Sequence, residues 1–155
     1  EIAAHLLAVG RPNSARLFLE RAWREEPDWP TAPGLLASVE LTAGRFTEAE
    51  AAARAATLAQ PSNGSLYHLL AQSLSGLGRH EEAIAARMRS LDSGLASRFR
   101  PWFLLAGDHA SAGDTLAALA ALDSADARAV SPADLDATRQ ARVALASPSN
   151  SNELD

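Results

Sequence analysis

The sequence contains no cysteine and no lysine, and only 5% of its residues are aromatic. Without cysteine the chain can form neither a disulfide framework nor a thiolate metal site, and this absence suits a reducing or an oxidising compartment equally, so the localisation stays open. All of the positive charge is arginine, which we interpret as codon bias in a GC-rich, bacterial genome. No apolar run reaches the roughly 18 residues of a membrane-spanning helix, so we expect no membrane span in this chain.

Charge of either sign is modest, and the formal net charge is −5. Binding to a nucleic-acid backbone needs a concentrated basic face, so we exclude nucleic acid as a partner. The length of 155 residues suits one domain. Alanine and leucine dominate the 47% of hydrophobic residues, and both are strong helix formers, which favours an all-α chain.

A glycine recurs along the chain at a nearly constant interval. Gly10, Gly44 and Gly78 are spaced by 34 residues, and Gly113 follows after 35. An alanine lies five positions beyond each glycine: Ala15, Ala49, Ala83 and Ala118. Self-similarity at such a period indicates a solenoid built from one repeated supersecondary unit. Each glycine suits the left-handed position just after the end of a helix.

Helical patterns occupy the segments on both sides of these glycines. The predicted helices cover residues 13–26, 31–43, 47–58, 65–77, 81–91, 100–112 and 115–127. The segment 47–50 has the sequence of a capping box, with Thr47 and Glu50 at its two ends. Glu82, Ala86 and Arg87 predict an exposed helix face.

The resulting helix pairs resemble the tetratricopeptide repeat (TPR) family up to about residue 128. A large apolar residue followed by a small one recurs in each first helix, as Ile2-Ala3, Leu36-Ala37, Leu70-Ala71 and Leu105-Ala106. The alanines that follow the glycines occupy the small position early in each second helix. The resemblance implies an all-α, right-handed superhelical solenoid of antiparallel helix pairs, with about three and a half TPR-like repeats and a C-terminal capping helix.

The repeats divide the chain into segments. The TPR-like array covers 1–129 and consists of a half-repeat, 1–29, and repeats 30–63, 64–98 and 99–129. Ser131 and Pro132 start a last helix, and we expect segment 130–147 to cap the array. Its expected apolar side consists of Ala137, Ala141, Val143 and Leu145. We expect the polar tail 148–155 to be disordered.

The N-terminal end contrasts with the capped end. Glu1 stands inside an apolar helical pattern, and Ile2, Leu6 and Leu7 lack upstream partners. We expect either more sequence upstream, which would make this the C-terminal part of a longer protein, or another surface over this edge. In the second case subunits would associate head to tail into a ring or a filament.

Signatures of catalysis and metal binding are absent. The sequence has no nucleophile elbow, P-loop, HExxH or paired-cysteine motif. No two of the four histidines lie three or four positions apart, so none can form a helical metal pair. We therefore predict that the chain is not an enzyme and has no cofactor or metal site.

The resemblance also implies that the first helices line a concave groove. The side chains implied to face it are Thr31, Gly34, Ser38, Leu41, Ser65, His68, Gln72, Ser75, Arg100, Phe103, Gly107 and Ala110. We select six of them as predicted partner-binding residues: Ser38, Leu41, His68, Gln72, Arg100 and Phe103. Outside the groove, we expect Trp29 to be the tryptophan that is partly exposed.

The predicted function is that of a non-catalytic TPR-type scaffold or adaptor. It would mediate protein–protein interaction through its concave groove, which is nearly neutral and suits an extended or helical segment of a protein partner. The alternative is a self-assembling structural subunit, which would form a ring or filament through its uncovered N-terminal repeat edge.

Overall fold

The computed structural model describes residues 2–26 and 29–147. Over these ranges the chain is helical and contains no strand, so the all-α class is confirmed. The chain folds as two compact units, unit 1 (residues 1–96) and unit 2 (residues 97–155).

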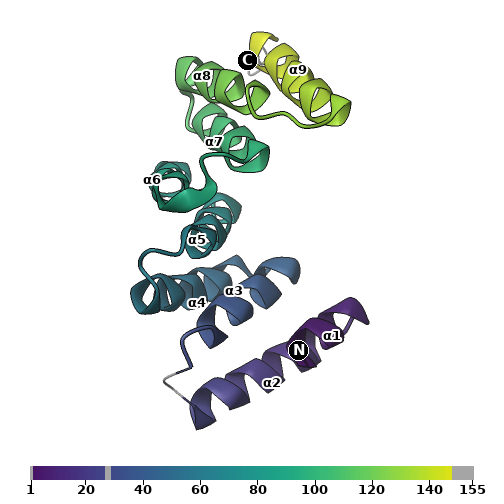
Figure 1. The fold of residues 1–155 in the computed structure, drawn as a ribbon, viewed down its shortest axis with the longest axis vertical. Helices are drawn as coiled ribbons and strands as arrows, with labels where there is room; N and C mark the ends of the chain where they lie inside the picture. The colour runs from purple at the N-terminus through teal and green to yellow at the C-terminus, as the bar shows by residue number, and fades with distance from the viewer. Residues whose placement is uncertain (1, 27–28, 148–155) are drawn as a thin grey trace, which may run out of the picture. The chain divides into compact units, whose positions relative to one another are not determined.

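Unit 1 is a series of helices in which each packs against the next (Figure 1). They are α1 (Ile2–Ala8), α2 (Pro12–Glu25), α3 (Ala32–Thr42), α4 (Phe46–Ala59), α5 (Gly64–Gly76) and α6 (His80–Ser90), followed by the π-helical segment η1 (Leu91–Leu95). The predicted helix ends agree with these bounds to within one residue. Short turns join α1 to α2, α3 to α4 and α5 to α6, so the helices of each pair run antiparallel.

The repeated glycines end the first helix of each pair. Gly44 has φ of +71°, and its N–H donates to the carbonyl of Leu41 at 3.0 Å while that of Arg45 donates to Glu40 at 2.9 Å. This pair of hydrogen bonds caps the free carbonyls at a helix end and requires a left-handed residue. The equivalent glycines, Gly10, Gly78 and Gly113, have φ between +71° and +83°. The predicted role of the glycines is therefore confirmed.

The capping box expected at residues 47–50 is wrong. Helix α4 begins at Phe46, so its N-cap is Arg45, and no side chain caps it. Thr47 thus lies inside the first turn. The glycine turn has already set the direction of the chain, so the N-cap lies two residues before Thr47.

Small residues allow the helices of unit 1 to approach closely. Ala15, Ala49 and Ala83 are 0% exposed. A Cβ added to Gly34 of α3 would lie 2.7 Å from Leu66 Cδ2 of α5, and one added to Gly64 would lie 2.6 Å from the carbonyl oxygen of Ser93 in η1. At Gly64 the close atoms belong to the backbone and leave no room for a larger residue, whereas at Gly34 the end of the Leu66 side chain would have to shift.

Unit 2 contains α7 (Phe99–Ser111), α8 (Thr115–Asp126) and α9 (Pro132–Ala146). Helices α7 and α8 form another antiparallel pair, and α9 packs mainly against α8. Ser131 and Asp134 form a reciprocal capping box at the start of α9. The backbone N–H groups of Val130 and Ser131 donate to the Asp134 carboxylate and lower its pKa.

The side of α9 that faces the rest of unit 2 differs from the prediction. Val143 is 63% exposed, whereas Thr138 is 2% exposed. The Arg142 guanidinium donates to Asp126 at 2.7 Å and to Asp123 at 2.8 Å. Helix α9 is therefore held on α8 by ion pairs as well as by apolar contact, which an apolar pattern could not reveal. The predicted disordered tail, 148–155, lies outside the described residues, as does the side chain of Leu7.

Candidate partner-binding surfaces

In unit 1 the predicted binding residues come from two neighbouring helices. Ser38 and Leu41 lie on α3, while His68 and Gln72 lie on α5. Helices α3 and α5 pack against each other, and all four side chains are half-buried. The four predicted residues thus lie on two helices that are in contact. Their role in binding stays a prediction.

A buried arginine supports the α5 part of this surface. Arg87 of α6 is 1% exposed, its Nη1 lies 3.4 Å from Nδ1 of His68, and its Nη2 donates to Ser75 Oγ at 3.4 Å. A guanidinium can only donate, so Nδ1 of His68 and the Ser75 hydroxyl are the groups placed to accept from Arg87. His68 is therefore partly exposed and also contacts the buried Arg87.

The exposed helix face predicted for α6 is therefore wrong at two positions. Ala86 is 7% exposed and Arg87 is 1% exposed, so both face the interior. Glu82 is exposed as predicted, and the guanidinium of Arg79 beside it lowers its pKa. A charged residue usually signals solvent, but here a long side chain reaches under the neighbouring helix to hydrogen-bond partners.

In unit 2 the two predicted binding residues lie on the first turns of α7. Arg100 is exposed, and Phe103 is half-buried. The Phe103 ring stacks on that of Phe99, with centroids 5.5 Å apart and planes inclined by 20°. The Phe103 ring also forms one wall of the space beside it.

That space is an open apolar pocket of about 290 Å³. Its lining residues are Phe103, Leu104, Ala106, Gly107, Ala110, Leu122, Ala141, Ala144 and Leu145. None of these side chains is charged or polar, so the pocket offers burial without a hydrogen-bonding partner and suits an apolar group.

The pocket joins predicted residues with others that the sequence did not indicate. The TPR resemblance implied that Phe103, Gly107 and Ala110 face the concave groove, and all three line this pocket. The contribution of α9 through Ala141, Ala144 and Leu145 was missed. Ala144 and Leu145 lie three and four positions after Ala141, which places all three on one side of a helix. Only the packing of α9 in the structure shows what that side faces.

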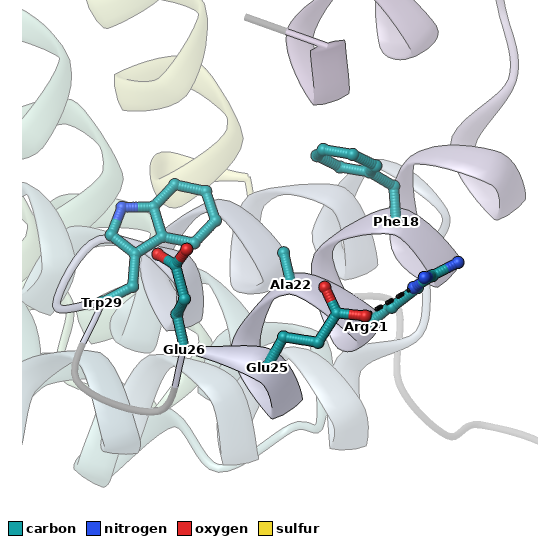
Figure 2. Close-up of a pocket in the computed structure, with 6 residues that line it drawn as sticks. All are labelled: Phe18, Arg21, Ala22, Glu25, Glu26 and Trp29. Atoms are coloured by element: carbon teal, nitrogen blue, oxygen red, sulfur yellow. Dashed lines mark hydrogen bonds and ion pairs between the residues drawn. The ribbon is translucent and has the colours of Figure 1, made fainter.

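A second pocket lies in unit 1 and has a different character (Figure 2). Its volume is about 430 Å³, and it is lined by Phe18, Arg21, Ala22, Glu25, Glu26 and Trp29. Trp29 is half-buried and packs against the core of unit 1, but Trp23 and Trp102 are half-buried too, so the structure does not single out Trp29 as the partly exposed tryptophan. The side-chain hydrogen bond from Arg21 Nε to Glu25 is 2.8 Å long and raises the pKa of Arg21.

The described residues contain no group of three or more histidine, cysteine or acidic side chains that could hold a metal ion. Over the same part of the chain, no helix combines the length and the apolar character required to cross a membrane.

Two tetratricopeptide repeat family models match the sequence, one over residues 6–74 and the other over residues 64–93. A comparison with curated protein sequences finds no match.

Solved structures of TPR proteins share the fold. MamA from Desulfovibrio magneticus RS-1 aligns with a TM-score of 0.77 at 17% identity, over 81% of this chain and 71% of that one. A second structure of MamA aligns at 0.80 and 13% identity, over 92% and 85%. A thermophilic TPR protein from Thermus thermophilus aligns at 0.75 and 21% identity, over 94% and 80%. The named source organisms are bacteria, which agrees with the predicted bacterial origin.

Together the two family models extend from residue 6 to residue 93, which is more than half of the 155 residues. The repeated glycine turns, the buried alanines and the antiparallel helix pairs agree with them. The chain belongs to the tetratricopeptide repeat family.

Proposed function

We propose that this chain is a non-catalytic adaptor that binds a segment of a partner protein through the first helices of its helix pairs. Membership of the TPR family supports a protein-interaction scaffold at a general level. The more specific proposal is that an apolar side chain of the partner occupies the pocket beside Phe103 in unit 2.

The pocket in unit 2 is the observation that carries this proposal. A space of about 290 Å³ with apolar walls is close to the lower limit of small-ligand sites and is ample for one side chain. Burying a leucine or phenylalanine side chain there would contribute about 1.5–3 kcal/mol. Rigid helices present the walls, so binding orders little of the protein and loses little entropy.

Gly107 allows a direct test of the pocket. A Cβ at this position would meet no atom within 4 Å, and Gly107 lies inside helix α7. The Gly107→Leu variant should fill the pocket while leaving the helix intact. Peptides would first be selected on the wild-type chain from a random library, and we expect them to carry a bulky apolar residue.

The affinity of such a peptide should fall at least about tenfold in Gly107→Leu, which corresponds to roughly 1.4 kcal/mol. The matched control is Gly107→Ala, which should bind as the wild type does, because one methyl group leaves most of the pocket open. Titration calorimetry would measure both. Equal affinities for the leucine variant and the wild type would refute the pocket as the binding site.

A second candidate function is self-assembly through the N-terminal edge. Exposed apolar residues of α1, of α2 and of the turn between them favour it, since Ile2, Val9 and Leu17 are 57%, 53% and 59% exposed. Large apolar side chains gathered on a surface commonly mark a protein contact.

Light scattering against concentration would separate the two functions. Self-assembly predicts a mass that rises with concentration and returns to that of a monomer in the Leu17→Glu variant. A monomeric mass at all concentrations would eliminate self-assembly and leave the adaptor function as it stands.

A further inference from the structure

The pocket on α2 combines aromatic walls with carboxylates (Figure 2). Phe18, Ala22 and Glu25 follow each other on one face of the helix, at spacings of four and three residues. Trp29, which lies outside the helix, lines the same pocket. Figure 2 shows Phe18 and Trp29 at opposite ends of this row, with Ala22 between them.

The negative charges of this pocket stand at an unfavourable place. Glu25 ends α2 and Glu26 is its C-cap, where the carbonyl groups already give the helix its negative end. Arg24 is the basic residue of the last turn, and Arg21 is paired with Glu25 in an exposed contact in which the two side chains are 77% and 62% accessible. Arg21 offsets the charge of Glu25, so the negative charge that a bound cation would meet is that of Glu26, next to the carbonyl end of the helix.

The aromatic rings add a second attraction for a cation. Phe18 is 37% exposed and Trp29 is half-buried, so both rings are accessible from the pocket. A cation over the face of an aromatic ring is attracted by its quadrupole, most strongly over tryptophan. A carboxylate and an accessible indole ring in the same pocket would thus both attract a cation.

We propose that this pocket binds an arginine side chain of a partner protein. A guanidinium is planar, stacks on an indole ring and can donate two parallel hydrogen bonds to one carboxylate, whereas a lysine ammonium is a strongly hydrated point charge. Glu26 is the expected carboxylate partner, because Glu25 already accepts from Arg21. The inference does not rest on the function proposed above, since its residues belong to α2 and the connection to α3 and not to the Phe103 pocket.

The test is a titration of the whole chain followed by heteronuclear NMR of the tryptophan indole signals. The probe is the capped tripeptide Gly-Arg-Gly, and its matched control is the same peptide with citrulline, which has the same shape without the charge. The Trp29 signal, assigned with the Trp29→Phe variant, should shift saturably with the arginine peptide. It should shift little with citrulline or with the lysine peptide.

Variants then locate the contact. Glu26→Gln should lower the affinity for the arginine peptide about fivefold, in the range of one exposed ion pair. Glu81→Gln removes an exposed glutamate from the first turn of α6 and should leave the affinity unchanged. A thermal melt of each variant shows that the fold is retained.

Several results would overturn the proposal. The first is an equal response to arginine and citrulline, and another is an unchanged affinity in Glu26→Gln. A response to tetramethylammonium with none to arginine would assign the pocket to small quaternary amines instead. A shift of the Trp29 signal with protein concentration alone would show that a second copy of the chain fills the pocket.

Discussion

Unit 1 and unit 2 are built from the same helix pair, but the spaces beside their first helices differ. In unit 1, the buried side chain of Arg87 contacts His68 and Ser75 of α5. In unit 2, α7 borders an open apolar pocket at Phe103 and Gly107. The surface at α5 has polar contacts beneath it, whereas the surface at α7 has an open pocket that can hold an apolar side chain.

The difference follows the regularity of the repeat. The glycine interval is constant from Gly10 to Gly78 and lengthens by one residue at Gly113, after the non-helical backbone at Ser93 and Gly94. The last helix, α9, then packs by ion pairs and small residues instead of the repeat pattern. The pocket beside the first helix α7 therefore lies in the part of the chain where the repetition is no longer strict.

The largest expected effect comes from adding volume in each unit. Ala83 is 0% exposed, so Ala83→Leu should overpack the contact and cost about 1–3 kcal/mol in the free energy of unfolding. Gly107→Leu adds a larger side chain in unit 2, but it enters the pocket and should not lower stability. Urea unfolding would measure both variants. Equal costs would break the comparison between the units.

Two side chains of α5 provide the next test. His68→Ala removes an acceptor of the buried Arg87 and should cost about 1–3 kcal/mol, because a buried polar group loses a partner. Gln72→Ala should change stability by less than about 0.5 kcal/mol, as is usual for substitutions away from such networks. Thermal melts would compare them. Equal melting temperatures would contradict the supporting role of Arg87.

Glycine substitutions in unit 2 should have opposite signs. Gly113 has φ of +83° and Gly107 is helical, while a Cβ at either position would meet no atom within 4 Å. Gly113→Ala should cost about 1 kcal/mol because alanine is strained in the left-handed region. Gly107→Ala should stabilise by up to about 1 kcal/mol through helix propensity. Chemical denaturation that gave the same sign for both would refute this account of the turns.

The smallest expected effect concerns acid. The Thr138 hydroxyl and the Arg142 guanidinium lower the pKa of Asp126. A lowered folded-state pKa means that the stabilisation is present above the unfolded value of about 3.9 and is lost as pH falls through the folded value. The side chains of Asp126 and Arg142 are each about one-third exposed, so the loss of stability should be below about 1 kcal/mol.

Melts of the wild type and of Asp126→Asn would measure this contribution. The two proteins should differ near neutral pH and converge below the folded pKa, since the wild-type carboxyl is then uncharged. A constant difference at every pH would contradict the ion-pair explanation.

Local chemistry predicted the helices well. Glycine turns, prolines and apolar periods placed every predicted helix end to within one residue. The errors concern side chains whose surroundings come from other segments. Thr47 lies inside its helix because the preceding turn fixes the start, and Arg87 is buried because α5 supplies its partners.

The site was predictable only in part for the same reason. Phe103, Gly107 and Ala110 follow from the repeat pattern, which implies the face of α7 that they occupy. Ala141 and Leu145 could not be assigned to that pocket, since the sequence of α9 does not say which helix it packs against. The pocket on α2 also includes Trp29, which lies outside the helix, and no local pattern predicts that this ring lines the same pocket as Phe18.

The most direct test of the binding surface is methyl NMR of the whole chain with a selected peptide. The account predicts that the largest shifts occur at the methyl groups of Leu104, Leu122 and Leu145, which line the Phe103 pocket. The methyl groups of Leu58, which is 83% exposed on α4, should not move. Shifts confined to other leucines, with none at the three pocket residues, would contradict the proposed function.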